Sequence, residues 1–498
     1  MEMSAQYLFA DCSSVWSIAV GILAVLLILP TLLKWGWHFY INRVYPADTA
    51  SSKPLPPGTL GYPIIGETIQ FILKIAEYYH ERRTKYGAIY KTHLMGRPTI
   101  RVSQAEYMKI IVNGENTIVI SQWPEATRRI LGNGALSMMS GETHKLRKKF
   151  VAAAFSQTAL QSYIPSFQTI CRQGLTEWRE RRHIIAFDEC KTLAFKIASK
   201  VLVGFQYEKS SELVDLFEVM MYNTFSLPIN LPGFGLYKGL KAKEKVVAEI
   251  DKCLMRIETE GSDQDFTTAM HFILYSQEGG ATIPRKELCE AANELLFTGH
   301  DTTSSTLCSV LMYLGKNPEY LHRLRAELKA NDLLDYDDDT VDLNLMKLNS
   351  LPFLHNVMKE TLRLAPPVGA GFRRAIKTFE VGDYQVPEGW TVSFGIRETH
   401  HNSPVFTKGL EFNPDRWTEE LSDLGKQETG KFNFLPFGYG SRICVGKEYA
   451  KLLTKVFIVE LCRSCDWELM NDDIKMSYIP VAKPKDSLPL CIYNRGDN

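Results

Sequence analysis

The sequence predicts a mainly α-helical catalytic domain with small β-sheets, preceded by one N-terminal membrane helix. Most windows between residues 106 and 329 have the helical period, whereas 88–94, 98–103 and 378–394 contain short strand-like runs. A long uncharged apolar segment precedes both. The 498 residues carry a formal net charge of zero, which gives no support to nucleic-acid binding.

The N-terminal apolar segment predicts a single-pass membrane anchor. No charged residue lies between Cys12 and Leu33, and about twenty apolar residues in a helix span the hydrocarbon core of a bilayer. Lys34, Arg43 and Lys53 follow the segment, which favours a cytosolic location for the rest of the chain. A cleaved signal peptide would have a basic start and a shorter apolar run. The expected organisation is a lumenal tail over 1–11, a transmembrane anchor over 12–33, a linker and proline-rich hinge over 34–58 and a catalytic domain over 59–498.

The globular part begins with a helical pattern over 68–86, and two strands joined by a turn at 95–98 follow it. Helix breaks are expected at 227–228, 231–233 and 278–280, where proline or glycine interrupts the period. The ten cysteines are scattered, which indicates reduced thiols in a cytosol-facing domain. Cys462 and Cys465 form an isolated C-x-x-C pair, for which a structural role is favoured over zinc or redox chemistry.

A glycine-rich loop over 434–446 carries Cys444 and leads into a helical pattern. Its glycines, Gly440 and Gly446 among them, allow the backbone to approach a bulky ligand where a Cβ would clash. The loop N–H groups and the helix N-terminus can stabilise a thiolate, which makes Cys444 a candidate ligand to a large metal cofactor. Arg442 offers a cation for a cofactor carboxylate, and Phe437 an apolar ring beside the sulfur. The alternative is a buried structural cysteine.

A second polar cluster interrupts the long apolar helix predicted around residue 300. Gly299, Asp301, Thr302 and Thr303 lower helix propensity there, and threonine hydroxyls can bond carbonyls of the preceding turn and open a groove. The alternative is a bent helix with a solvated aspartate.

Two charged patterns complete the candidate set. Glu360 and Arg363 lie three residues apart on one helical face, and Arg416 in FNPDRW could complete a buried network with them. The basic stretch 144–150 offers His144, Arg147 and Lys148 as cations, or alternatively a solvated face that docks an acidic protein.

The pattern F-x-x-G-x-R-x-C-x-G over 437–446 resembles the haem-binding loop of the cytochrome P-450 superfamily, and the resemblance covers residues 54–495. It implies the cytochrome P-450 fold and haem b (iron protoporphyrin IX), with Cys444 as the thiolate metal ligand. It also implies that Asp301 and Thr302 manage protons and that Glu360, Arg363 and Arg416 hold the fold around the loop. Where the family usually has Trp and Arg at a haem propionate, this chain has His144 and Lys148. Thr298 stands where the family prefers Ala or Gly, so its side chain should narrow the pocket or add a polar contact.

A narrower resemblance joins the chain to the retinoic acid hydroxylases. It rests on LPPGTLGYPIIGETIQF, KYGAIYKTHLMGRPTIRV, RRILGNGALS, HKLRKKF, LPINLPGFGLYKGLKAK and FLPFGYGSRICVGKEYAK. The family's substrate is a long apolar polyene with one carboxylate, which requires an apolar pocket with a donor at one end. Arg128 or Arg97 is a candidate for the carboxylate. Candidate wall residues are Trp123, Phe225, Leu227, Phe297, Val368 and Phe372 within the 367–372 loop.

The function that this resemblance implies is a monooxygenase in the endoplasmic reticulum membrane, with a cytosolic catalytic domain, that hydroxylates the ring of retinoic acid. It would use O2 and electrons from NADPH–cytochrome P-450 reductase, because no nicotinamide, flavin or Walker motif is legible in the chain. A sterol or fatty-acid hydroxylase of the same fold is the nearest alternative. A haem-thiolate isomerase needs no reductase and commonly lacks the acid–threonine pair, and a non-enzymatic haem binder would not consume NADPH.

Overall fold

The structure is a computed structural model that describes residues 3–44, 46–205, 210–261, 268–275, 283–334, 343–417 and 430–496. The chain divides into two compact units. Unit 1 contains residues 1–101 and 377–392, and unit 2 contains 102–376 and 393–498. The mainly helical fold with small sheets agrees with the sequence prediction.

Unit 1 begins with α1 (Met3–Val44), a helix of 42 residues. Its segment Val20–Trp37 is long and apolar enough to cross a membrane, and none of it is buried. This span overlaps the expected anchor over 12–33. Six further elements follow: α2 (Thr68–Leu73), α3 (Ile75–Tyr86), β1 (Ile89–Leu94), β2 (Arg97–Val102), β6 (Phe379–Val381) and β7 (Tyr384–Val386). The single helix expected over 68–86 is two helices, because Lys74 leaves helical geometry with φ −138° and ψ 49°.

Unit 2 contains most of the helices. They are α4 (Ala105–Asn113), α5 (Glu125–Leu131), α6 (Gly141–Ala153), α7 (Gln157–Arg181), α8 (Ala186–Ala198), α9 (Ser210–Tyr222), α10 (Gly235–Glu260), α11 (Ala269–Tyr275), α12 (Arg285–Lys316), α13 (Pro318–Ala330), α14 (Leu345–Asn349), α15 (Pro352–Leu364), α16 (Ile396–Asn402) and α18 (Lys447–Ser464). Short 3₁₀ turns include η1 (Leu136–Met138), η5 (Pro414–Trp417), η7 (Gly430–Asn433) and η8 (Gly440–Arg442), and Ser199–Val203 is a π-helical turn, η2. The expected breaks at 227–228 and 231–233 fall between α9 and α10, and the one at 278–280 lies outside the described residues.

The strands of unit 2 form small antiparallel sheets. β12 (Pro489–Asn494) lies between β4 (His183–Ile185) and β9 (Cys465–Leu469), and Leu490 faces both Ile184 and Leu469. β3 (Val119–Ser121) pairs with β5 (Ala370–Ala375), and β10 (Met476–Ser477) with β11 (Lys483–Pro484). β8 (Thr391–Gly395) spans the boundary between the two units.

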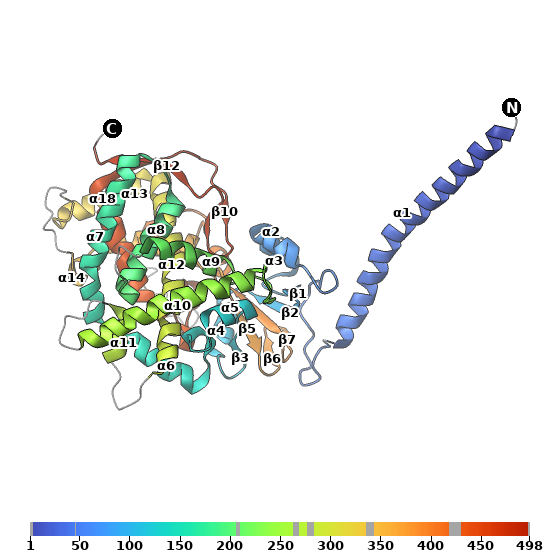
Figure 1. The fold of residues 1–498 in the computed structure, drawn as a ribbon, viewed down its shortest axis with the longest axis horizontal. Helices are drawn as coiled ribbons and strands as arrows, with labels where there is room; N and C mark the ends of the chain where they lie inside the picture. Colours follow the sequence, from blue (N-terminus) through green and yellow to red (C-terminus); the bar gives the residue numbers. More distant parts are fainter. Residues whose placement is uncertain are drawn as a thin grey trace. The chain divides into compact units, whose positions relative to one another are not determined.

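The core of unit 2 is built around α12, which packs against α15 and against α8, α10 and α18, the last three labelled in Figure 1. The C-x-x-C cysteines lie in this core: both are buried, and burial raises the pKa of Cys462 to about 12 and that of Cys465 to about 11. Within the described residues, no group of three or more His, Cys, Asp or Glu side chains could hold a metal ion. Burial and the raised pKa keep both groups as thiols within the core at neutral pH.

Candidate active site

The loop that precedes α18 holds Cys444 in a defined backbone geometry. Gly440 has a φ of +72°, and a Cβ at this position would lie 2.7 Å from the carbonyl oxygen of Val112, so only glycine fits without strain. The Cys444 N–H donates to the Phe437 carbonyl at 2.9 Å. Lys148 on α6 donates from Nζ to the carbonyls of Ser441 (2.7 Å) and Ile443 (3.0 Å). The loop is thus tied from two sides, just before the helix N-terminus at Gly446.

The thiol of Cys444 is exposed on one side and closely surrounded by chain on the others. Burial raises its pKa, while a hydrogen bond from the Gly446 N–H and the positive charges of Lys148 and Lys447 lower it. A metal ion deprotonates a coordinating thiol outright, and the same N–H and ammonium groups would then stabilise the thiolate. The donor set fits a thiolate ligand with one accessible face.

Arg442 belongs to a charged triad in unit 2. Its Nε lies 2.9 Å from Glu115 Oε1, and Arg373 Nε lies 2.8 Å from Glu115 Oε2. Glu115 also accepts a hydrogen bond of 3.1 Å from the Ser121 N–H, and Arg442 donates to the Met139 carbonyl. Arg442 is therefore a fixed cation beside the Cys444 loop, as its predicted contact with a cofactor carboxylate requires. Arg373 was not among the predicted residues. In the sequence, only its position next to the candidate residue Phe372 could have indicated a functional role.

The basic stretch of α6 divides into three different environments. Lys148 holds the Cys444 loop, and Arg147 pairs with Glu287 of α12. His144 is buried, and burial together with the charges of Arg442 and Lys148 lowers its pKa to about 4. At neutral pH His144 is thus an uncharged imidazole, which can donate a hydrogen bond to a carboxylate but supplies no cation.

A short accessible strip marks the middle of α12. Every residue from 288 to 312 is buried except Phe297, Thr298, Gly299, Asp301 and Thr302, and among these Thr298 is the most exposed. This strip is the part of α12 that a ligand could contact. The hydroxyls follow the helix backbone, because Thr298 Oγ1 donates to the Glu294 carbonyl at 2.8 Å and Thr302 Oγ1 to the Thr298 carbonyl at 2.6 Å.

Asp301 lies at the edge of the same strip. Its Oδ1 is 2.9 Å from Nδ1 of His300, a buried ring that stands edge-on to Phe195 and Phe217. Burial raises the pKa of Asp301, but His300 and the charges of Lys191 and Lys483 outweigh it and hold the pKa below its usual value. The carboxylate is therefore ionised at neutral pH beside the accessible Thr302, the arrangement that proton transfer requires.

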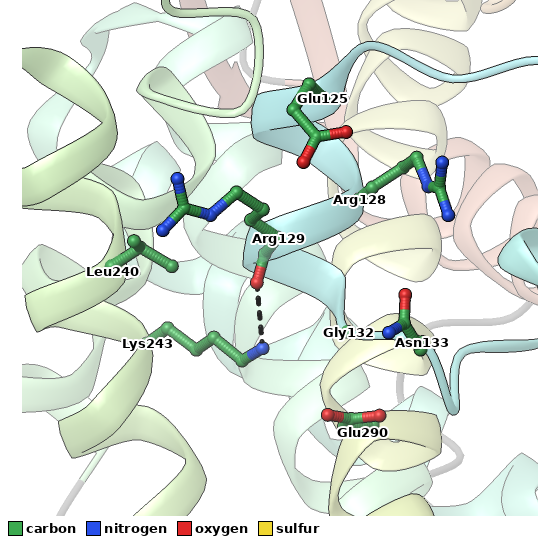
Figure 2. A pocket seen from close by; sticks show the side chains of 8 residues that line it. All are labelled: Glu125, Arg128, Arg129, Gly132, Asn133, Leu240, Lys243 and Glu290. Atoms are coloured by element: carbon green, nitrogen blue, oxygen red, sulfur yellow. Dashed lines mark hydrogen bonds between the residues drawn. The ribbon is translucent and has the colours of Figure 1, made fainter. Parts of the chain in front are cut away.

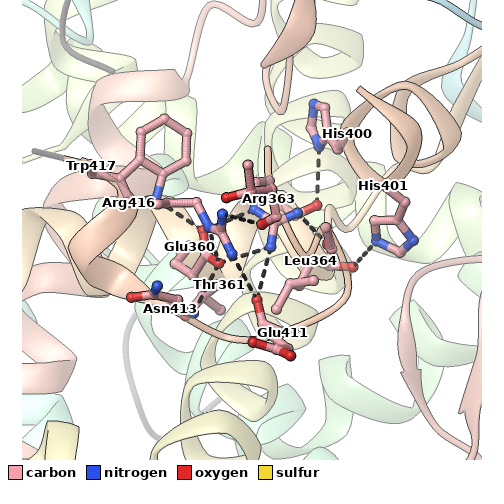
Figure 3. A network of polar contacts seen from close by, with 12 residues as sticks. Glu360, Thr361, Arg363, Leu364, His400, His401, Glu411, Asn413, Arg416 and Trp417 are labelled. Atoms are coloured by element: carbon pink, nitrogen blue, oxygen red, sulfur yellow. Dashed lines mark hydrogen bonds and ion pairs between the residues drawn. The ribbon is translucent and has the colours of Figure 1, made fainter. Parts of the chain in front are cut away.

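Glu360, Arg363 and Arg416 form one buried network (Figure 3). Glu360 Oε1 lies 2.8 Å from both Arg363 Nη2 and Arg416 Nε, and Oε2 accepts from Trp417 Nε1 at 3.0 Å. The arginines also donate to carbonyls of the 407–411 segment, so the network joins α15 to η5 and the chain before it. Within the described residues, none of the three side chains forms a hydrogen bond with a residue of the accessible strip. The network therefore has a structural role, since it joins chain segments to one another.

The comparisons with known proteins identify the family. The family model of cytochrome P450 matches residues 56–492. Cytochrome P450 26A1 of Gallus gallus is 42% identical to this chain over 479 residues, which are 94% of this chain and 95% of the relative. Human cytochrome P450 26B1 is 34% identical over 493 residues, which are 96% of this chain and 95% of the relative. This chain is a cytochrome P450. A solved structure, "Retinoic acid bound cyanobacterial CYP120A1", is similar with a TM-score of 0.80 and 30% identity over 89% of this chain and 100% of that one.

Members of the cytochrome P450 family are monooxygenases that bind haem through a cysteine thiolate and use O2 and an electron donor. The residues around Cys444 fit such a group, because an accessible thiol, two fixed arginines and a neutral histidine lie around one loop. The predicted wall residues of this P450 are accessible to different degrees. Trp123, Phe297 and Phe372 are half-buried, whereas the exposed wall residues are Phe225, Leu227 and Val368. Arg128 is exposed and lines a separate polar cleft.

Proposed function

We propose that this P450 is a retinoic acid hydroxylase that oxidises the ring of its substrate. The observation that carries the proposal is the similarity of 89% of the chain to a P450 whose structure contains retinoic acid. The 42% sequence identity to cytochrome P450 26A1 supports the same substrate. A long apolar substrate also suits the Phe297–Gly299 part of the strip, where the accessible groups are a phenyl ring, a methyl-bearing threonine and a glycine.

In this proposal Cys444 is the haem ligand, within the loop formed by Phe437, Gly440, Arg442 and Gly446. The bound haem supplies the reductive activation of O2. Three polar groups of the chain are proposed to face its carboxylates, directly or through the loop: the cations Arg442 and Lys148 and the neutral imidazole of His144. Asp301 and Thr302 hold and pass protons at the edge of the accessible strip, where α12 keeps most neighbouring side chains away from water.

The substrate contacts are proposed for Trp123, Phe225, Phe297, Val368 and Phe372, with Arg128 at the carboxylate. Phe297 belongs to the accessible strip of α12, and Phe372 accepts a hydrogen bond from the Gln122 N–H through its carbonyl, one residue before Trp123. The segment before α5 and the 367–372 loop are therefore held together at this point. Aromatic side chains of this kind bind a polyene by burying apolar surface against it and not through hydrogen bonds.

We also propose that α1 holds the enzyme in the endoplasmic reticulum membrane by one span, with the catalytic domain in the cytosol and NADPH–cytochrome P450 reductase as electron donor. The apolar segment Val20–Trp37 supports the anchor. Exposed apolar side chains after the hinge add lipid-compatible surface, namely Tyr62, Ile64, Ile65, Ile69, Ile72 and Leu73. Deletion of residues 1–40 should release a haem-loaded domain from membranes, and failure of that domain to bind haem would show that the anchor is needed for folding.

The test of the substrate is a spectral titration of the ferric enzyme with retinoic acid, a sterol panel and a fatty-acid panel. Retinoic acid should change the haem spectrum at the lowest concentration and should start NADPH consumption in the presence of the reductase. A stronger response to a sterol or a fatty acid would reassign the substrate within the same enzyme class. Product formation without reductase would favour the isomerase alternative.

A further inference from the structure

Glu294 on α12 binds the backbone of the segment that connects α5 with α6. Its side chain is buried, and each carboxylate oxygen accepts one main-chain N–H: Oε2 that of Leu136, and Oε1 that of Ser137 at 2.8 Å. Burial raises the pKa of Glu294, whereas hydrogen bonds from Ser137 and Leu136 and the charge of Arg442 lower it. Hydrogen bonds to a carboxylate are about twice as strong as neutral ones, so Glu294 fixes the position of both N–H groups.

The face of α12 that carries Glu294 continues into the accessible strip. Glu294 and Thr298 are four residues apart, so their side chains are neighbours on one face of the helix. Thr298 Oγ1 donates to the Glu294 carbonyl at 2.8 Å, and side chains of a helix lean toward its N-terminus, here toward the turn of Glu294. Leu136 and Ser137 are therefore held next to the most exposed residue of the strip.

The Leu136–Met139 segment presents apolar side chains at this place. All its residues are half-buried, whereas Ala135 directly before them is fully buried. At the other end of the segment, the Met139 carbonyl accepts a hydrogen bond from Arg442, the fixed cation beside the Cys444 loop. The segment thus runs from the accessible strip to Arg442. Its leucine and two methionines are suited to an apolar ligand, because methionine side chains adapt to irregular surfaces.

We infer that Glu294 is a positioning residue, which fixes the Leu136–Met139 segment as a wall of the substrate site next to Thr298. The inference rests on the proposed function, to which it adds a side chain that acts on the substrate without touching it. The wall limits where a long apolar molecule can lie along α12, and so which of its carbons is oxidised. When Glu294 no longer holds the two N–H groups, the wall should move and large apolar ligands should bind less tightly.

Glu290, one turn earlier in α12, provides a matched control. It is buried like Glu294 and binds the same connection, but through a single N–H, that of Gly134 at 2.6 Å. Figure 2 shows Glu290 close to the Gly132–Asn133 turn. Glu290→Gln keeps an acceptor oxygen for Gly134. Glu294→Gln has one amide oxygen for two N–H groups and directs its own NH2 toward one of them.

The experiment compares two ligands that coordinate haem iron through nitrogen, imidazole and dodecylimidazole. Only the second has an alkyl chain that can reach the wall, and neither carries a carboxylate. Their dissociation constants are measured by spectral titration of the full-length haem-loaded enzyme. Glu294→Gln should weaken binding of dodecylimidazole about tenfold and leave binding of imidazole unchanged, because one charge-assisted hydrogen bond of the wall is lost. Glu290→Gln should bind both ligands like the wild-type enzyme.

A double-mutant cycle tests whether Glu294 acts through the wall. Leu136→Ala shortens the wall directly, and in this background Glu294→Gln should weaken dodecylimidazole by only about twofold, because residues that act through one contact are not additive. Additive effects would overturn the inference. An equal loss of imidazole and dodecylimidazole binding in Glu294→Gln would also overturn it, since general damage to the haem site would then explain both.

Two further measurements separate other causes. If Glu294→Gln does not load haem, Glu294→Asp, which keeps the charge on a shorter side chain, supplies the same comparison of the two imidazoles. With retinoic acid and the reductase, the Glu294 variant should change the ratio of oxidation products. Failure of the wild-type enzyme to bind retinoic acid would contradict the proposed function, whereas the dodecylimidazole titrations would still decide whether Glu294 positions the wall.

Discussion

The hydroxyl of Thr302 donates a hydrogen bond of 2.6 Å to the main-chain carbonyl of Thr298, one turn earlier in α12. Thr306 donates in the same way to the carbonyl of Thr302, and Thr298 to that of Glu294. These three threonines bond to the backbone of their own helix, so their oxygens are fixed and their methyl groups face away from the bonded carbonyls. For Thr298 and Thr302, which belong to the accessible strip, this arrangement fixes which side-chain atoms are available to a ligand.

Substitution of Thr302 tests the proposed proton path. Thr302→Ala should leave haem binding intact but lower the rate of product formation by about 10²-fold, because the hydroxyl next to Asp301 is lost. NADPH and O2 consumption should continue, so the ratio of product to NADPH should fall. Thr302→Ser keeps the hydroxyl and should retain much of the coupling. An unchanged ratio in Thr302→Ala would mean that protons arrive by another route.

Thr298 is expected to act through its methyl group. Its hydroxyl proton is donated to the Glu294 carbonyl, so of the two effects expected from the sequence, narrowing of the pocket is favoured over donation of a hydrogen bond to the substrate. Thr298→Val keeps the shape and should preserve the product pattern, whereas Thr298→Ala should widen the cavity and change the ratio of oxidation products. Chromatographic analysis of the products of all three enzymes checks this. A Val variant that behaves like the Ala variant would show that the hydroxyl contacts substrate.

Cys444→Ala should abolish the red-shifted Soret band of the reduced carbon monoxide complex, because that band reports thiolate ligation. Cys462→Ala is the matched control: Cys462 is buried in α18 of the same unit, and its loss should leave the band in place. A retained band in Cys444→Ala would remove Cys444 from the ligand assignment.

The network around Glu360 should dominate the stability of this region. Glu360→Ala leaves two buried guanidinium groups without their carboxylate, and we expect a loss of about 3–5 kcal/mol in the free energy of unfolding. Arg323→Ala is the control, because its ion pair with Asp415 is about half exposed and contributes at most about 1 kcal/mol. Thermal unfolding of the purified variants measures both, and equal losses would show that the network carries no special weight.

The sequence predicted features in which the residues are neighbours or carry a fixed spacing. The anchor helix and the Cys444 loop are of this kind. So is the Glu360–Arg363 pair, because helix geometry alone brings residues three apart together. Arg416 was found only because a family pattern marks it. The contact of Arg442 with Glu115 joins residues 327 positions apart, and no local pattern indicates such a partner.

Other features were missed for different physical reasons. The break at Lys74 has neither proline nor glycine, so the helical period of 68–86 continued through it. Arg373 lies in a short strand where alternation gives no sign of an ion pair. The exposure of Thr298 depends on how several helices pack around α12, which periodicity within one helix does not encode.

His400 predicts how stability depends on pH. It is fully buried on α16, where Nδ1 lies 3.1 Å from the Arg363 carbonyl and Nε2 accepts the Leu435 N–H at 2.8 Å, so the ring is neutral with its proton on Nδ1. Burial, with help from the charges of His401 and Arg363, lowers its pKa from 6.5 to about 3. The unfolded chain therefore binds a proton below pH 6.5 that the folded protein does not.

This difference stabilises the fold fully above pH 6.5 and is lost as the pH falls toward 3. For one such histidine the free energy of unfolding should decrease by at most about 1.4 kcal/mol per pH unit. His400→Gln can still donate to Arg363 and accept from Leu435 but does not titrate, so its unfolding free energy should depend less steeply on pH. Urea unfolding of both proteins at pH 7, 6 and 5 measures the two slopes. Protonation of the buried His400 would break the hydrogen bond that Nε2 accepts from the Leu435 N–H, so the folded protein resists it. Parallel slopes would therefore contradict the prediction: they would mean that His400 is protonated in the folded protein or that another group controls the loss of stability in acid.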